Sequence, residues 1–280
     1  MTPPVVLTIA GSDSGGGAGI QADLKAIAAT RCYGASVITA VTAQNTRGVT
    51  DVHPIPVATV SSQLAAVLDD LPVAAVKTGM LGSAEIAGEV AALARAGQLP
   101  NLVVDPVLVS STGHELGVVD AVERLLPYAL VATPNVAEAA ALVGRPVTTP
   151  EEMARAAADL AAAGVKHVVV TGGDLPDSED AVDALWTDGH CRFLRGPRVP
   201  TRHNHGSGCT FSAATAAGLA RGLSVIAAVE QAKSYVARAL AGSVGWRIGA
   251  GIGPLDHFEW TSPAGTAAGS ATGNDQGGNA

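Results

Sequence analysis

The amino-acid sequence predicts an α/β fold with a doubly wound, mostly parallel sheet, helices on its faces and a small added β-hairpin. Three observations predict it. Apolar, β-branched runs of strand length alternate with longer Ala-rich segments of helical period. A Gly-rich turn follows the first apolar run directly. Asp188-Gly189 separates two short runs in the manner of a tight hairpin.

The elements follow from this alternation in chain order. Parallel strands are expected where the apolar runs lie, at residues 5–10, 35–42, 74–78, 102–105, 130–132 and 167–171. Helices are expected over the Ala-rich segments, at residues 18–30, 59–71, 83–96, 120–126, 136–143, 150–163, 209–221 and 224–242. The helix at 150–163 has a complete start signal, with Thr149 as N-cap, Pro150 first and Glu152 closing a capping box. The hairpin pairs residues 184–187 with 190–195.

Length and composition limit the organisation and the location. The chain has 280 residues, close to the upper size of one hydrophobic core. Residues 261–280 are mainly Gly, Ala, Ser, Thr and Asn without periodicity, so we expect one domain over residues 1–260 and a disordered tail over 261–280. No run approaches the ~18 apolar residues of a membrane span. The start of the chain lacks the basic flank of a secretory signal, so the cytoplasm is expected.

Charge and cysteine content exclude several kinds of partner and site. The net charge is −8, and only four of the 17 basic residues are lysines, so no basic stripe for nucleic acid is present. Three widely spaced cysteines fit neither a disulfide framework nor a zinc cluster and are expected to be reduced. If the protein binds a phosphate compound, it must use local devices such as helix N-termini, backbone amides and a divalent metal.

The first motif with possible chemistry is the Gly-rich stretch 11–19, between a predicted strand and a helix. Dinucleotide-binding folds place such a turn there and an acidic residue ~20 positions later. Residues 25–50 contain no Asp or Glu, which argues against a dinucleotide, and the absence of Gly-Lys-Ser/Thr argues against a P-loop. The stretch can also be only a flexible turn.

The second motif covers residues 204–210 and leads into a helix of small residues. Consecutive amides at a helix N-terminus form an anion hole, and Gly206 and Gly208 let a phosphate approach closely. Cys209 would lie in the positive end of the helix dipole, which favours its thiolate as base or nucleophile. The alternative is that Cys209 is a small buried residue and that the glycines only shape a turn.

Other polar residues follow predicted strands. Asp105 precedes a proline, and Asn135 and Glu138 lie three apart at a helix start, where they could face a metal-bound phosphate. Alternatively, Asp105 is a turn former before proline and Glu138 a partner of the helix dipole in a first turn. Gln44, with Asp23 in the first predicted helix, could match a ring nitrogen beside an exocyclic amine, although many loop glutamines face solvent.

Taken together the motifs resemble the ribokinase-like superfamily, and within it the hydroxymethylpyrimidine/phosphomethylpyrimidine kinases of thiamine biosynthesis. The resemblance runs from about residue 5 to 260 and is carried, in order, by the stretches 10–23, 42–46, 77–81, 104–107, 133–135, 205–209 and 251–254. It implies the doubly wound fold and an active site at the carboxyl ends of the strands. The implied activity is ATP-dependent phosphorylation of 4-amino-5-hydroxymethyl-2-methylpyrimidine and then of its monophosphate.

The resemblance also implies roles for particular residues. Around the pyrimidine it places Gln44, Gly11, Ala18, Asp23, Met80 and Val107. For phosphoryl transfer it implies Cys209 as base and the amides of Gly206, Ser207, Gly208 and Cys209 as the anion hole. ATP would lie near Asn135, Thr171, Gly173 and Lys233, with Mg²⁺ near Asp105 and Glu138. A homodimer is a further expectation from it. The loop 110–115 is rich in small residues, which favours a lid that closes over a substrate.

One departure and two alternatives remain open. The resembling enzymes often carry Lys-Gly-Gly where this chain has Thr171-Gly172-Gly173. Lys233 or a monovalent ion could replace the missing charge, or the amides and Mg²⁺ could suffice. A pyridoxal kinase is the nearest alternative function, and Gln44 discriminates because it suits an aminopyrimidine edge better than a phenolic one. A non-catalytic binding protein is the second alternative.

Overall fold

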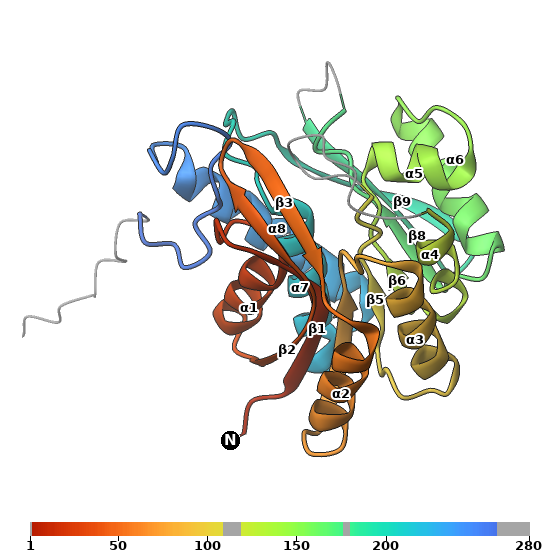
Figure 1. Ribbon diagram of the computed structural model, residues 1–280. Helices are drawn as coiled ribbons and strands as arrows, with labels where there is room; N and C mark the ends of the chain where they lie inside the picture. Colours follow the sequence, from red (N-terminus) through yellow and green to blue (C-terminus); the bar gives the residue numbers. More distant parts are fainter. Residues whose placement is uncertain (1, 109–118, 176–179, 262–280) are drawn as a thin grey trace, which may run out of the picture.

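The computed structural model describes residues 2–108, 119–175 and 180–261. The described chain forms one nine-stranded sheet of order β3-β2-β1-β4-β5-β6-β7-β8-β9 (Figure 1). The strands are β1 (Val5–Asp13), β2 (Tyr33–Asn45), β3 (Gly48–Pro54), β4 (Val73–Thr78), β5 (Val103–Val104), β6 (Val131–Ala132), β7 (His167–Val170), β8 (Asp180–Thr187) and β9 (His190–Pro197). The six neighbouring strands β2, β1, β4, β5, β6 and β7 are parallel, and the predicted α/β class is confirmed.

Helices cover both faces of this sheet. They are α1 (Gly19–Ala29), α2 (Val57–Leu68), α3 (Ala84–Arg95), α4 (Val119–Glu123), α5 (Val136–Val143), α6 (Pro150–Ala162), α7 (Ser207–Ala220) and α8 (Val225–Ser243). Successive strand residues face opposite layers: Val6 packs into a core formed with α1, α7 and α8, and Leu7 into a core formed with α2, α3, α5 and α6. The Thr149 capping box at the start of α6 is confirmed.

Helix α7 is buried along most of its length, which explains its composition. Nearly all of its residues from Thr210 to Leu219 are small, and all of them are buried. A Cβ on Gly218 would lie 2.8 Å from the Cβ of Ala228 in α8, so small side chains allow the two helices to pack closely. The N-terminus of α7 is thereby held at the carboxyl ends of the parallel strands.

The strand β3 is the main departure from the sequence prediction. Residues 48–54 are mostly exposed and include Asp51, His53 and Pro54, so the segment lacks the apolar run by which the other strands are recognised. It pairs antiparallel with β2, which is longer than predicted and extends to Asn45. Figure 1 shows the ribbon of β2 and β3 rising past the parallel part of the sheet. Gln44 lies on this ribbon.

The strand order defines where a ligand can bind. Strand β1 lies between β2 and β4. The chain passes from β1 to β2 on one side and later returns to form β4 on the other side, so the strand order reverses at β1. Such a reversal opens a crevice at the carboxyl ends of the strands. The predicted hairpin is confirmed as β8 and β9. Among the described residues, no helix has the length and apolar character that a membrane span requires. Of the predicted tail, residues 262–280 lie outside the described part, as do residues 110–115 of the predicted lid.

Candidate active site

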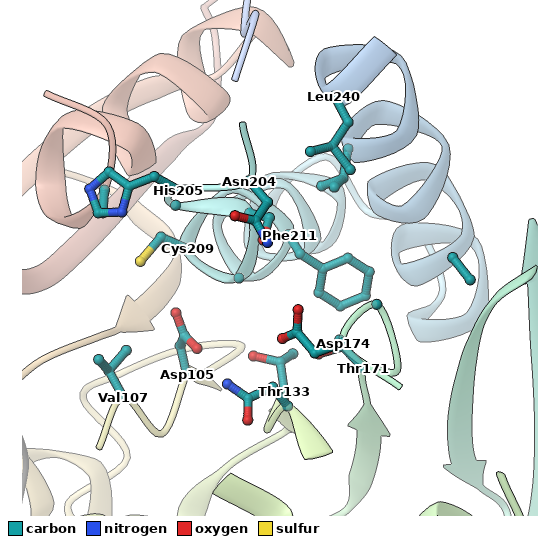
Figure 2. Close-up of a pocket in the computed structure, with 18 of the residues that line it drawn as sticks. Asp105, Val107, Thr133, Thr171, Asp174, Asn204, His205, Cys209, Phe211 and Leu240 are labelled. Atoms are coloured by element: carbon teal, nitrogen blue, oxygen red, sulfur yellow. The ribbon is translucent and has the colours of Figure 1, made fainter. Parts of the chain in front are cut away.

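A cavity of about 1070 Å³ opens at the carboxyl ends of the strands. It is lined by all of the site residues predicted from the sequence except Asp23. Figure 2 shows that the cavity has two ends: His205, Cys209 and Val107 lie at one, and Thr171 and Asp174 at the other. We call these the substrate end and the nucleotide end. The loop before α7 lies between them.

The start of α7 forms the expected amide cluster. Gly206 is the N-cap and has a left-handed backbone with φ +83°. The first amide bonded into the helix is that of Thr210, which donates to the Gly206 carbonyl at 2.9 Å. The amides of Gly208 and Cys209 thus precede the helical hydrogen bonds and remain as donors for an anion. The Ser207 amide is different, because it donates to the Asn204 carbonyl at 3.1 Å.

Gly206 also fixes this loop against the first Gly-rich loop. A Cβ on Gly206 would lie 1.9 Å from the Gly17 carbonyl oxygen. We therefore expect Gly206→Ala to cost about 3 kcal/mol or more of stability, from strain at positive φ and from steric overlap. Gly208→Ala is the matched control, since its Cβ would meet no described atom within 4 Å. Thermal unfolding of both variants tests this, and equal melting temperatures would contradict it.

The protonation of Cys209 differs from the sequence prediction. Burial raises the pKa of the thiol to about 12, although the charge of Lys77 and the Gly19 amide lower it. The carboxylates of Asp105 and Asp23 add to the rise. Burial thus outweighs the expected effect of the helix dipole on the thiol, and at neutral pH the free protein carries the thiol.

Asp23 lies beneath the cavity in a buried charge cluster. Its carboxylate accepts a hydrogen bond from Thr8 Oγ1 at 2.6 Å and two from Lys77 Nζ at 3.0 Å each. Lys77 Nζ is also 3.3 Å from Asp105 Oδ2, which accepts a hydrogen bond from Ser212. Lys77 lines the cavity, so Asp23 acts on the substrate end through this lysine and through its own charge, which raises the pKa of Cys209.

The rest of the substrate end is apolar and closely packed. Met80 is 7% exposed and lines the cavity, and a Cβ on Gly11 would lie 2.2 Å from Met80 Cε. Glycine at position 11 therefore allows the methionine to form the wall. Ala18 and Val107 add small apolar surface, and Gln44 contributes the amide. This set can hold a flat ring with a polar edge.

At the nucleotide end, Asn135 and Glu138 form a second capping box. Asn135 Oδ1 accepts from the Glu138 amide and Glu138 Oε2 from the Asn135 amide, each at 2.9 Å. The alternative interpretation of Glu138 as a helix-start residue is thus confirmed. Burial raises its pKa to about 8, and the charges of Asp105 and Asp174 add to the rise. The site therefore holds acidic groups that repel one another.

Asp105 and Glu138 fit Mg²⁺ as a pair of protein ligands that is completed by groups from outside the protein. Asp105 and Glu138 are carboxylates that face the same cavity, as Mg²⁺ prefers. Within the described residues, however, no cluster of three or more His, Cys, Asp or Glu could hold a metal ion alone. A magnesium ion here would take its other ligands from substrate phosphates and water, which is usual for this metal.

Two basic side chains that line the cavity, Lys233 and Arg198, already bind other groups of the protein. Thr171, at the position where the resembling enzymes often carry lysine, lines the cavity, and so does Gly173. Lys233 Nζ also lines it but is bound to Asp183 Oδ2 at 2.7 Å and to the Ala181 carbonyl at 3.0 Å. Arg198, which the sequence analysis did not select, lines the cavity too and donates to the Leu175 carbonyl at 2.6 Å.

Three further residues of the cavity were missed from the sequence. Lys77 lies within one of the motifs but was given no role, and a lone lysine in an apolar strand was its only signal. Asp13 and His205 also lie within motifs, and Asp13 Oδ2 is hydrogen-bonded to His205 Nε2 at 2.9 Å. Their contact joins segments 192 residues apart, so spacing gives no sign of it.

Known proteins are similar over most of the chain. The phosphomethylpyrimidine kinase family model matches residues 13–256. The hydroxymethylpyrimidine/phosphomethylpyrimidine kinase of Streptomyces coelicolor is 51% identical over 261 residues, 92% of this chain and 95% of that protein. The chloroplastic thiamine biosynthetic bifunctional enzyme of Arabidopsis thaliana is also 51% identical over 261 residues, 91% of this chain and half of that protein.

Solved structures agree with this assignment. The pyridoxal kinase of Staphylococcus aureus, in complex with AMP-PCP and pyridoxal, has a TM-score of 0.85 at 37% identity and covers 94% of this chain and 96% of that one. The phosphomethylpyrimidine kinase of Clostridium difficile has a TM-score of 0.73 at 39% identity, covering 85% and 99%. The resemblance drawn from the motifs is confirmed. The family model matches most of this chain, and relatives are 51% identical to it. The chain therefore belongs to the phosphomethylpyrimidine kinase family.

Proposed function

We propose that this chain is a bifunctional kinase of thiamine biosynthesis. It transfers the γ-phosphoryl group of ATP to 4-amino-5-hydroxymethyl-2-methylpyrimidine and then transfers a second one to the monophosphate. One observation supports it above the others: Gln44, Cys209 and the first amides of α7 line the same cavity as Asn135 and Glu138. Asn135 pairs with Thr171, and Glu138 interacts with Asp174, so both lie toward the nucleotide end. A ring with a polar edge, a hydroxyl to be phosphorylated and a triphosphate can lie there in line.

The residues divide the work of the reaction. Gln44 binds the aminopyrimidine edge, and Met80 holds the ring so that its hydroxymethyl group lies near Cys209 Sγ. The amides of Gly208 and Cys209 stabilise the charge on the group in transfer. In the first step the hydroxyl proton passes to Cys209 Sγ in the molecules that carry the thiolate, since the protonated thiol has already filled its proton site. In the second step the nucleophile is already an anionic phosphate, and no strong base is needed.

Magnesium would be held at Asp105 and Glu138, where its charge would neutralise the triphosphate. We further propose a homodimer in the cytoplasm, built on one catalytic domain of residues 1–260 with a tail over 261–280. Sedimentation of the full chain and of a chain ending at residue 260 tests the assembly. Loss of activity or of the dimer in the shorter chain would contradict the assigned boundary.

A coupled ADP-release assay tests the function directly. The pyrimidine alcohol, its monophosphate and pyridoxal are compared at saturating ATP and Mg²⁺. We expect turnover of both pyrimidines. Pyridoxal is the second candidate substrate, because the Staphylococcus aureus structure of similar fold is a pyridoxal kinase. Turnover of pyridoxal alone would replace the assignment, and no turnover of any of the three would favour a binding protein.

Thr171 gives a prediction specific to this chain. Thr171→Lys places a cation at an end of the cavity that carries Asp105, Glu138 and Asp174. We expect the KM for ATP to fall about tenfold, since a charge-assisted hydrogen bond to phosphate contributes about 1.5 kcal/mol. Thr171→Gln is the uncharged control of similar reach. An unchanged KM for ATP in the lysine variant would mean that existing groups, such as Lys233 or Arg198, already supply the charge.

A further inference from the structure

The carboxylate of Asp13 organises the first Gly-rich loop. Its Oδ1 accepts from the Gly15 amide at 2.8 Å, and its Oδ2 accepts from the Gly17 and Ala18 amides at 3.0 and 2.8 Å. Asp13 is 3% exposed. Burial alone would raise its pKa, but the hydrogen bonds from His205 and from these amides hold the pKa below its ordinary value. Asp13 is therefore an acceptor at all physiological pH values.

His205 links this carboxylate to Gln44. Its ring is 5% exposed, and its Nε2 lies 2.9 Å from Asp13 Oδ2 and 3.2 Å from the terminal amide group of Gln44. The backbone of Gln44 is anchored separately, because its amide and carbonyl both bind Ser14 Oγ at 2.8 Å. Only the side-chain torsions of Gln44 remain to be fixed. The contacts available for this are His205 and Thr42, whose Oγ1 lies 3.2 Å from the Gln44 side-chain amide.

The proton positions in this chain of contacts follow from Asp13. An ionised Asp13 requires the His205 proton on Nε2. The structure has Gln44 Nε2 facing His205 Nε2 and Gln44 Oε1 accepting from Thr42 Oγ1, which would set two N–H groups against each other. With the amide turned the other way round, its oxygen shares the His205 N–H with Asp13 Oδ2, and its NH₂ group donates to Thr42 Oγ1, whose own proton goes to the Ser12 carbonyl at 2.9 Å. The two ends of a primary amide have the same shape, so such a network decides their order. One hydrogen and one lone pair of the amide remain for a ligand.

We propose that His205, held by Asp13, is a positioning residue that fixes the orientation of the Gln44 side-chain amide. The amide oxygen and the NH₂ group then face defined positions on the pyrimidine edge, which determines specificity for an aminopyrimidine. The inference rests on the proposed function, in which Gln44 binds the substrate ring. His205 immediately precedes Gly206, so the same contact joins the substrate end to the start of the anion loop. The orientation of the Gln44 amide thus depends on His205, which contacts it, and on Asp13, which holds His205.

The test is a double-mutant cycle with His205→Phe and Gln44→Ala. We expect His205→Phe to raise the KM for the pyrimidine alcohol about tenfold, because the substrate must then order the glutamine itself. The KM for ATP should stay within about twofold and kcat within about threefold. In the Gln44→Ala background His205→Phe should have no further effect on the pyrimidine KM. His205→Gln, which keeps a side-chain N–H, should restore most of the loss.

Two controls separate this role from a structural one. His203→Phe replaces another buried histidine of the same loop, whose Nδ1 accepts from the Gly253 amide at 3.2 Å, and it should leave the pyrimidine KM unchanged. If His205→Phe does not fold, Thr42→Val removes the other anchor of the amide and should give the same KM effect and the same loss of effect with Gln44→Ala.

The outcomes are distinguishable. An equal rise of the pyrimidine KM with and without Gln44, or a parallel rise of the KM for ATP, would overturn the positioning role while pyrimidine turnover by the unaltered protein upholds the proposed function. Absence of pyrimidine turnover in the unaltered protein would overturn the proposed function, and this inference with it.

Discussion

Replacing Cys209 by alanine is expected to lower turnover of the pyrimidine alcohol about 100-fold, and turnover of its monophosphate less than about tenfold. The asymmetry arises because the first step must remove a proton from a hydroxyl group, and a positioned base contributes ~10² to 10⁴ in rate. The second nucleophile is an anion already. Steady-state kinetics on the two substrates with the same enzyme preparation measure both losses.

The raised pKa of Cys209 adds a pH dependence to this prediction. Since the thiol titrates with a pKa of about 12 in the free protein, the thiolate fraction grows with pH across the whole accessible range. Turnover of the alcohol should therefore rise from about pH 6 to 9. The monophosphate has its second pKa near ~6, so its turnover should level off above pH 7. A pH profile of kcat for each substrate shows the difference.

Two variants decide whether the thiol acts as a base. Cys209→Asp supplies the residue that sugar kinases of the superfamily carry here, and it should restore part of the first step with a flat profile above pH 7. Cys209→Ser keeps the size of the side chain but lacks a usable acidity, so it should resemble the alanine variant. Equal losses of turnover on both substrates would mean that Cys209 contributes packing at the loop and not proton transfer.

The fold was largely predictable because burial is periodic in the sequence. The parallel strands are buried on both faces and read as continuous apolar runs, and the capping box at Thr149 has a fixed spacing. The strand β3 was not predictable in this way. It is an exposed edge strand held by antiparallel pairing with β2, and neither its pattern nor its composition separates it from a loop.

The site was predictable in position but not in electrostatics. Residues after the strand ends and in the two Gly-rich loops line the cavity, as topology requires. The pKa of Cys209 could not be predicted, because it depends on carboxylates from distant segments, Asp23 and Asp105. The contact between Asp13 and His205 likewise depends on the packing of two loops. Long-range contacts of single polar side chains leave no period in a sequence.

Replacing Lys77 by methionine is expected to destabilise the protein by about 3 to 5 kcal/mol, the usual cost of removing one partner from a buried ion pair. Lys77 and Asp23 are both fully buried, and Asp105 is 4% exposed. Methionine matches the length of the aliphatic chain but leaves two carboxylates without their cation. For a chain of this size the melting temperature should fall by roughly 10 °C or more.

Both partners of the pair determine how this loss depends on pH. Burial alone would lower the pKa of Lys77, but the charges of Asp23, Cys209 and Asp105 raise it well above its ordinary value, so the contribution of the lysine is constant up to its unfolded-state value, about 10.4. Burial raises the pKa of Asp23, and the charge of Lys77 lowers it, so without the lysine the ionised Asp23 becomes more costly as pH rises. The difference in unfolding free energy between wild type and Lys77→Met should therefore grow from pH 6 to 9.

Two further variants separate buried charge from general packing. Lys77→Met combined with Asp23→Asn removes one of the unpaired charges and should recover part of the lost stability, since neutral replacements of a whole buried pair are tolerated far better than half of one. Lys233→Met is the comparison at a more exposed pair, with Lys233 at 16% and Asp183 at 8% exposure, and should cost less. Denaturant unfolding measures all four proteins. If the double variant were no more stable than Lys77→Met alone, the cost would lie in the shape of the lysine and not in the uncompensated carboxylates beneath the substrate.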